Sequence, residues 1–263
     1  MARRTLSQTG PLLARLAFVA AVLLAQGARA QDAYPSELVQ RPLVLPDGMV
    51  EFNANLGIDL SKDQFFNPVS VAPGVRIGLA HRLELDFTTD PFGLFPPGSG
   101  LCAGDACGHA WNGAYVGLAY NIGGSGPFQA ALHGAFGFTA FDPVILGTAV
   151  GVKLRLQSGL LAVVFDPTLG IGLTHRDTFG DSLNLPLEVQ FQTARDTALR
   201  FITGLNGPLD SFGDRFAIPL AVGVFFNVQP RFDVGAQAGF TNLLGRGGGL
   251  DGREVSAVAN LRL

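Results

Sequence analysis

Apolar and polar residues alternate along most of this chain. Residues 51–60 read Glu-Phe-Asn-Ala-Asn-Leu-Gly-Ile-Asp-Leu, and residues 82–88 and 231–241 keep the same alternation. A period of two places successive side chains on opposite faces of a β-strand, whereas a helix would scatter Glu84, Asp86 and Thr88 over different faces. The pattern therefore predicts an all-β protein.

The same pattern recurs often enough to predict about twelve strands, separated by connections of alternating length. The strands are expected at residues 49–60, 71–81, 82–89, 113–122, 127–140, 145–157, 159–173, 183–193, 196–205, 215–227, 230–242 and 253–263. Short turns alternate with mostly longer connections near residues 61–70, 90–112, 141–144, 174–182, 206–214 and 243–252. Short turns at one end and long loops at the other are typical of antiparallel barrels in outer membranes.

The face opposite the apolar one distinguishes a membrane barrel from a soluble sandwich. A sandwich turns its apolar face inward and its charged face to water. In this chain the second face is mostly small or amide-bearing, with Gly57, Gly117, Gly223 and Gly235 as examples. Small residues suit the crowded interior of a closed barrel, so we expect the apolar side chains (Leu83 and Phe232 among them) to face lipid.

Composition agrees with this arrangement. The 263 residues are 48% hydrophobic and 15% charged and include 35 Gly and 21 Phe. The apolar content excludes a disordered chain, and Gly does not recur at every third position as in collagen. Beyond residue 30 no apolar run approaches the ~20 residues of a membrane-spanning helix.

The first thirty residues have the three parts of a secretory signal peptide. Arg3 and Arg4 precede an apolar run at residues 16–24, and Ala28-Arg29-Ala30 resembles a cleavage site. We expect cleavage after residue 30, a periplasmic lead-in over residues 31–47 and the barrel over residues 48–263. Without the four arginines of the leader, 14 basic residues face 21 acidic ones, which argues against a nucleic-acid partner.

These segments resemble a bacterial outer-membrane β-barrel of the porin-like, outer-membrane transporter type. The resemblance lies in residues 41–48, which lead into the first strand, in the paired strands at residues 74–85, and in the similar turn unit at residues 226–235. It implies an antiparallel up-and-down transmembrane β-barrel in the outer membrane of a Gram-negative bacterium. It also implies contact with outer-membrane lipid, insertion by the barrel-assembly machinery and a possible oligomer.

If the apolar face meets lipid, the charged residues of the other face line the lumen. The pore-lining candidates are Glu51, Arg76, Glu84, Asp86, His133, Lys153, Arg155, Glu188, Arg200 and Asp233. Asp59, Arg82, Asp166, Glu254 and Arg262 have the same parity. Facing charges of this kind set the ion preference of a pore. Alternatively, acids and bases pair across a plugged interior and only hold the barrel together.

The two cysteines lie five residues apart in the long connection 90–112. In an exported protein Cys102 and Cys107 are expected to form a disulfide, which would staple this loop as a possible lid over the external mouth. A metal site of Cys102, Cys107 and His109 is the alternative, but no fourth ligand is near, so no metal is predicted.

Catalytic chemistry finds little support. A nucleophile, a base and an orienting group must lie within reach of one another, and the nearest approach is His175 with Asp177 and Ser182 in one loop. No cofactor motif is present either, because the glycine-rich residues 245–249 are not followed by a helix. The sequence therefore predicts a passive or weakly selective channel for small solutes. The alternatives are a non-conducting structural or adhesion barrel and, less favoured, an outer-membrane hydrolase.

Overall fold

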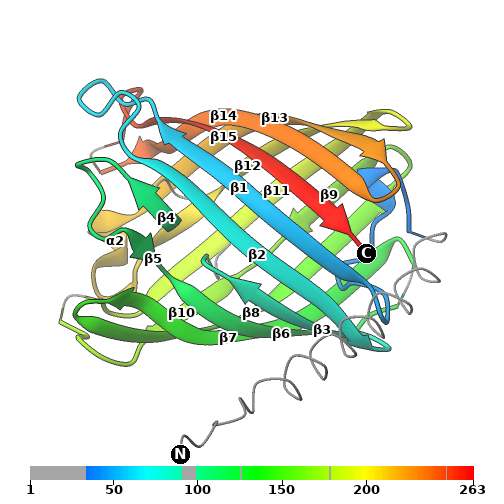
Figure 1. Cartoon of the computed structure of the whole chain (residues 1–263), viewed down its shortest axis with the longest axis horizontal. Coiled ribbons are helices and arrows are strands. Elements are labelled where there is room, and N and C mark those ends of the chain that lie inside the picture. Colours follow the sequence, from blue (N-terminus) through cyan, green and yellow to red (C-terminus); the bar gives the residue numbers. More distant parts are fainter. Residues whose placement is uncertain (1–33, 91–98, 125, 178, 247) are drawn as a thin grey trace, which may run out of the picture.

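The computed structural model describes residues 34–90, 99–124, 126–177, 179–246 and 248–263. Over these residues the chain forms one closed antiparallel barrel with twelve strand positions (Figure 1). We call each position a stave, because some of them are occupied by two shorter strand segments in succession. The predicted signal peptide lies in residues 1–33, outside the described residues. Among the described residues, no helix has the length and apolar character needed to cross a membrane.

Fifteen strand segments build the twelve staves. The strands are β1 (Val50–Asp59), β2 (Val69–Ala80), β3 (Leu83–Thr88), β4 (Gly100–Ala103), β5 (Trp111–Asn112), β6 (Ala114–Asn121), β7 (Phe128–Phe141), β8 (Val144–Ser158), β9 (Leu161–Phe165), β10 (Thr168–Gly172), β11 (Ser182–Ala194), β12 (Thr197–Pro208), β13 (Ala217–Gln229), β14 (Phe232–Gly245) and β15 (Arg253–Arg262). Three short helices complete the described chain: η2 (Leu38–Gln40), η3 (Leu209–Ser211) and α2 (Phe212–Arg215). Neighbouring staves follow one another in sequence, and β1 pairs with β15 from Glu51↔Arg262 to Asp59↔Glu254, which closes the sheet.

The predicted strand set is confirmed, with two refinements. The stave predicted at residues 159–173 is split into β9 and β10 at Pro167, whose nitrogen has no hydrogen to donate to the ladder. The connection predicted as a loop at residues 90–112 contains β4, which extends the stave of β3 against β2, and the two-residue β5. A four-residue strand carries too few alternating positions to be recognised by period.

The two ends of the barrel differ as predicted. Turns at residues 81–82, 122–127, 159–160, 195–196 and 230–231 lie at one end, which we call the short-turn end. Except for the two-residue turn at residues 142–143, longer connections lie at the other, the long-loop end. The C-terminus lies at the short-turn end in Figure 1, and the Val50 N–H donates to the Leu263 carbonyl oxygen there (N···O 3.0 Å).

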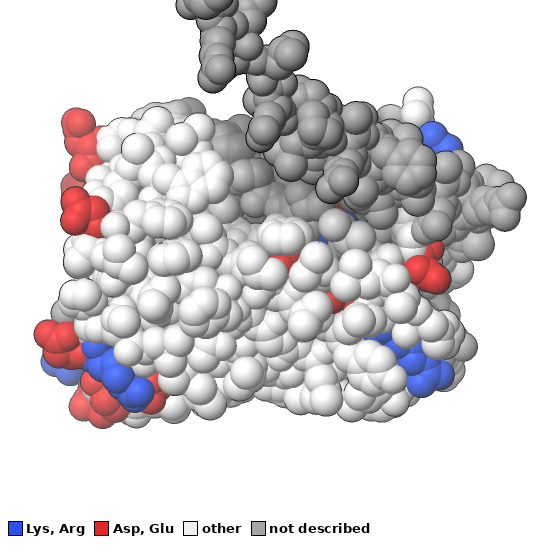
Figure 2. All heavy atoms as spheres, turned by 60° about the horizontal axis from the view of Figure 1, so that its bottom comes forward, with Lys and Arg blue, Asp and Glu red and all other residues white. Residues whose placement is uncertain are grey.

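Burial is inverted relative to a soluble protein. On β1, Phe52 and Leu56 are exposed while Glu51 and Asn55, on the other face, are buried. The same inversion holds for large apolar side chains around the barrel, including Leu118, Phe136, Phe201, Val222, Phe226 and Leu261. In Figure 2 most of the described charged side chains on the face shown lie near its two ends, and the middle is largely uncharged. An uncharged apolar band between charged ends is what a bilayer requires.

Substituting an arginine into the apolar band tests whether this band faces lipid. We expect Val222→Arg, in the middle of β13, to destabilise the barrel in phospholipid vesicles by about 2–4 kcal/mol, because a charge would enter the hydrocarbon. Val228→Arg, equally apolar and exposed but beside the 230–231 turn, is the matched control and should cost about 0–1 kcal/mol. Chemical denaturation in vesicles measures both values. Equal, small losses at the two positions would contradict a lipid-facing middle.

Candidate functional site

The residues before β1 fold into the barrel instead of trailing from it. Residues 34–49, which we call the N-terminal plug, lie in the short-turn end, where the first described, blue part of the chain appears in Figure 1. Val39 and Met49 have no exposed surface, and Leu43, Val44 and Leu45 are buried. The segment predicted as a periplasmic lead-in therefore occupies the mouth of the barrel.

The plug bonds to strands around much of the barrel wall. The Leu43 N–H donates to Gln129 of β7 (3.1 Å), the Leu45 N–H to Glu84 of β3 (2.7 Å) and the Val39 N–H to Gln192 of β11 (3.4 Å). In the opposite direction, Arg155 of β8 donates to the Leu38 carbonyl oxygen (3.0 Å). Side chains from distant staves thus satisfy the backbone of an otherwise irregular segment, as burial requires.

At Gly78 the backbone of β2 approaches the backbone of the plug directly. The Gly78 N–H and carbonyl oxygen bond to the backbone of Met49 and Gly48 (2.9 and 2.8 Å). A Cβ at this position would collide with the Pro46 carbonyl oxygen, so the plug fits against β2 only because residue 78 has no side chain.

A continuous chain of buried ion pairs fixes the plug. Arg41 of the plug makes a bidentate contact with Asp233 of β14 (2.7 and 2.8 Å), and Asp233 also pairs with Arg262 of β15. Arg262 continues to Glu51 of β1 (2.8 Å), and Arg76 of β2 joins Glu51 (3.1 Å) to Glu84 (2.8 Å). Because Glu84 accepts from the Leu45 N–H, the chain of contacts returns to the plug.

Above the plug lies a cavity of about 420 Å³ enclosed by the staves. Nine of the ten pore-lining candidates line it: Glu51, Arg76, Glu84, Asp86, His133, Lys153, Arg155, Glu188 and Arg200. The tenth, Asp233, is fully buried in the ion-pair chain. Arg82, which has the same parity, lies exposed in the 81–82 turn with a positive φ of 72° and does not line the cavity. Alternation had counted this turn residue as the first residue of a strand.

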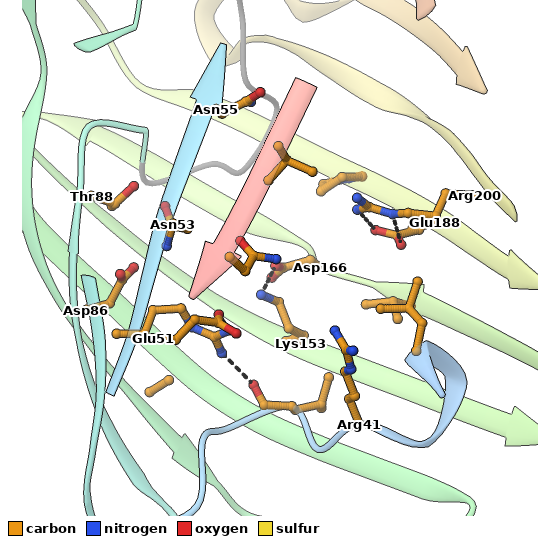
Figure 3. Close-up of a pocket in the computed structure, with 18 of the residues that line it drawn as sticks. Arg41, Glu51, Asn53, Asn55, Asp86, Thr88, Lys153, Asp166, Glu188 and Arg200 are labelled. Carbon is orange, nitrogen blue, oxygen red and sulfur yellow. Dashed lines mark hydrogen bonds and ion pairs between the residues drawn. The ribbon is translucent and has the colours of Figure 1, made fainter. Parts of the chain in front are cut away.

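Two further ion-pair groups stand on the wall formed by β7–β12. Asp166 accepts from Lys153 (3.0 Å) and contacts the His133 ring (Nε2···Oδ1 2.7 Å). Arg200 makes a bidentate contact with Glu188 (2.7 Å for both bonds), as Figure 3 shows. Charges therefore line a cavity and most of them are paired, whereas their effect on the ion preference of a pore stays a prediction.

Several lining residues were missed by sequence reasoning. Arg41 and Tyr34 were assigned to the lead-in, and their entry into the barrel has no periodic signature. Neutral Asn53, Asn55, Thr88 and Gln190 also line the cavity. The signal for these four was present, because each shares the parity of a charged candidate on its own strand.

The described part of the loop with the cysteines contributes little to the cavity lining. Cys102 and Cys107 form a disulfide (S–S 2.05 Å), so neither thiolate is available to a metal. Of the described residues in the connection 90–112, Asp90 lines the cavity and residues 99–112 do not, and residues 91–98 lie outside the described residues. A lid formed by this loop therefore stays a prediction, and the narrowing present in the described residues is that of the plug at the other end.

Within the described residues, the candidates for a hydrolase site and for a metal site do not make the contacts that such sites require. Among the described residues, no hydrogen bond joins His175 to Asp177 or Ser182, and Arg176 instead pairs with Asp181 (2.8 Å). The described part of the chain holds no group of three or more His, Cys, Asp or Glu that could bind a metal ion.

Comparison with known proteins places the fold. No protein family and no curated protein matches the sequence. Among solved structures, the NanC porin matches with a TM-score of 0.58 and 12% identity over 80% of this chain and 98% of that one. The COG4313 outer membrane channel from Pseudomonas putida F1 matches with a TM-score of 0.55 and 12% identity over 84% and 97%. The KdgM porin, solved with a disordered oligogalacturonate, has a TM-score of 0.53 and 8% identity over 80% and 98%. The chain therefore has the fold of outer-membrane porins.

The ion-pair chain should dominate the stability of the short-turn end. We expect Asp233→Asn to lower the free energy of unfolding by about 3–5 kcal/mol, because it leaves Arg41 buried without its counter-charge. The matched control is Asp181→Asn, whose partner Arg176 is largely exposed; it should cost about 0–1 kcal/mol. Denaturant titration of the refolded barrel checks both. A loss below 1 kcal/mol for Asp233→Asn would show that the pairs do not hold the plug.

Proposed function

We propose that the protein is an outer-membrane channel that lets small polar solutes diffuse through its lumen. The observation that carries the proposal is the cavity of about 420 Å³ inside a closed barrel, lined by charged and amide side chains. A barrel that only anchored loops would gain stability by filling this space with apolar side chains. The porin fold and the names of its structural neighbours support the same function.

Location and orientation follow from the same features. The apolar exterior fits the outer membrane, the short-turn end would face the periplasm, and the long loops would face outward. The leader-like residues 1–30 would direct export. Insertion by the barrel-assembly machinery, and any oligomer, stay predictions.

The plug controls how freely solutes leave the lumen in this proposal. It crosses the periplasmic mouth and bonds to β2, β3, β7, β8, β11 and β14. Small solutes would pass beside it or when it shifts. A non-conducting structural barrel is the second candidate, and the same plug is the observation in its favour.

A substitution that loosens the plug distinguishes a channel from a non-conducting structural barrel. We expect Gly78→Ala to raise the single-channel conductance of the purified protein several-fold, because its Cβ would meet the Pro46 carbonyl oxygen and displace the plug. Gly126→Ala, in a turn at the same end and with open space around its Cβ, is the matched control and should conduct like the unchanged protein. Planar-bilayer recording measures the conductance. Closed bilayers for the unchanged protein and for Gly78→Ala would refute the channel.

A further inference from the structure

The acids that the lumen presents outnumber its bases, and the ion pairs show which of these acids are left without a basic partner. Five luminal carboxylates (Glu51, Glu84, Asp166, Glu188 and Asp233) each lie within ion-pair distance of an arginine or lysine. Three others, Asp59, Asp86 and Glu254, form no ion pair among the described residues. Most of the ionisable groups left without an ion pair in the described lumen are therefore acids.

These three carboxylates lie along one wall, from the cavity toward the long-loop end. Asp86 of β3 lines the cavity between its cross-strand partners Arg76 of β2 and Gly117 of β6, without an ion pair to Arg76. Asp59 of β1 and Glu254 of β15 are direct cross-strand partners of each other. They lie on the same faces of their strands as the lining residues Asn55 and Ser256. Two carboxylates directly opposite each other destabilise the strand pair, and a cation between them would relieve the repulsion.

Arg155 is the one luminal cation without a carboxylate partner in the part of the chain that the structure describes, and it does not offset these acids. Arg155 is 4% exposed and donates to the Leu38 carbonyl oxygen of the plug. It therefore lies at the closed end of the lumen. The cations that stand higher on the wall, Lys153 and Arg200, are each bound to an acid.

Buried amide oxygens add a second, independent observation. Asn55 lines the cavity and is 5% exposed, and its side-chain oxygen accepts no hydrogen bond from any residue that the structure describes. The same holds for the side-chain oxygen of Gln190, which is 8% exposed. Figure 3 shows Asn53, Asn55, Thr88 and Asp86 on one side of the cavity and the Glu188–Arg200 pair on the other. A buried acceptor without a donor is costly, and a solute rich in N–H or O–H groups would satisfy it.

We propose that the lumen selects cations and that its solutes are small organic cations carrying a primary ammonium group. An ammonium group offers one positive charge and three donors, which match the carboxylates of Asp59, Asp86 and Glu254 and the acceptor of Asn55. Acidic side chains lining a pore attract cations and exclude anions. This inference rests on the proposed function, since it specifies what the channel carries.

The first test is the reversal potential of the purified protein in a planar bilayer under a KCl gradient. We expect K⁺ to permeate roughly five times faster than Cl⁻ or more, because each unpaired carboxylate attracts cations along the whole path. The combined variant Asp59→Asn, Asp86→Asn and Glu254→Gln should bring this ratio close to one. Asp63→Asn, exposed in the loop after β1, is the matched control and should leave the ratio unchanged.

The second test uses organic solutes of similar size and opposite charge. Vesicles containing the protein should swell several-fold faster in lysine than in glutamate, and the combined variant should lose this difference. If the combined variant does not refold, as judged by its heat-shifted electrophoretic band, Asp86→Asn alone is measured and should reduce both preferences.

The outcomes separate the two proposals. An open channel that prefers Cl⁻ and glutamate, or shows no preference, overturns the cation inference and leaves the channel intact. Bilayers and vesicles that stay closed, even with Gly78→Ala, overturn the channel and the inference together.

Discussion

Closure of the sheet by the pairing of β1 with β15 is the constraint on which the rest of the molecule depends. Every stave then has two hydrogen-bonded neighbours, so no edge is left to be satisfied by water, and the exterior can be wholly apolar. Closure also divides the side chains into an outer set and an inner set. The outer set includes Phe52 and Leu56, and the inner set includes Glu51 and Asn55.

The enclosed polar face must satisfy its own charges, and the plug does much of this. Arg41 supplies the cation that Asp233 needs, and the Leu45 N–H supplies a donor to Glu84. The plug and the ion-pair chain are therefore mutually dependent, because removing either leaves buried charges without partners. Asp59 and Glu254, which form no ion pair among the described residues, lie toward the long-loop end, and the cation inference assigns them a role in attracting solutes.

Period-two alternation was sufficient to predict the staves, their faces and nine of the lining residues, because closure leaves the inside–outside alternation intact along every strand. The plug lay beyond this reasoning. Residues 34–49 have no period, and their position depends on contacts with residues up to 192 positions away, such as Arg41 with Asp233. The ion pairs could not be predicted from alternation either, since the sequence gives the acids and bases but does not show which of them lie together.

The central claim is that one face of each stave borders a water-filled, negatively charged lumen. Single cysteines at Asn55 and at its neighbour Leu56 test it most directly, in protein embedded in vesicles and with the native disulfide intact. The account predicts that Asn55→Cys reacts with a water-soluble cationic thiol reagent, more slowly with an anionic reagent of the same size, and that Leu56→Cys reacts with neither. Rapid modification of Leu56→Cys with an unreactive Asn55→Cys would contradict it.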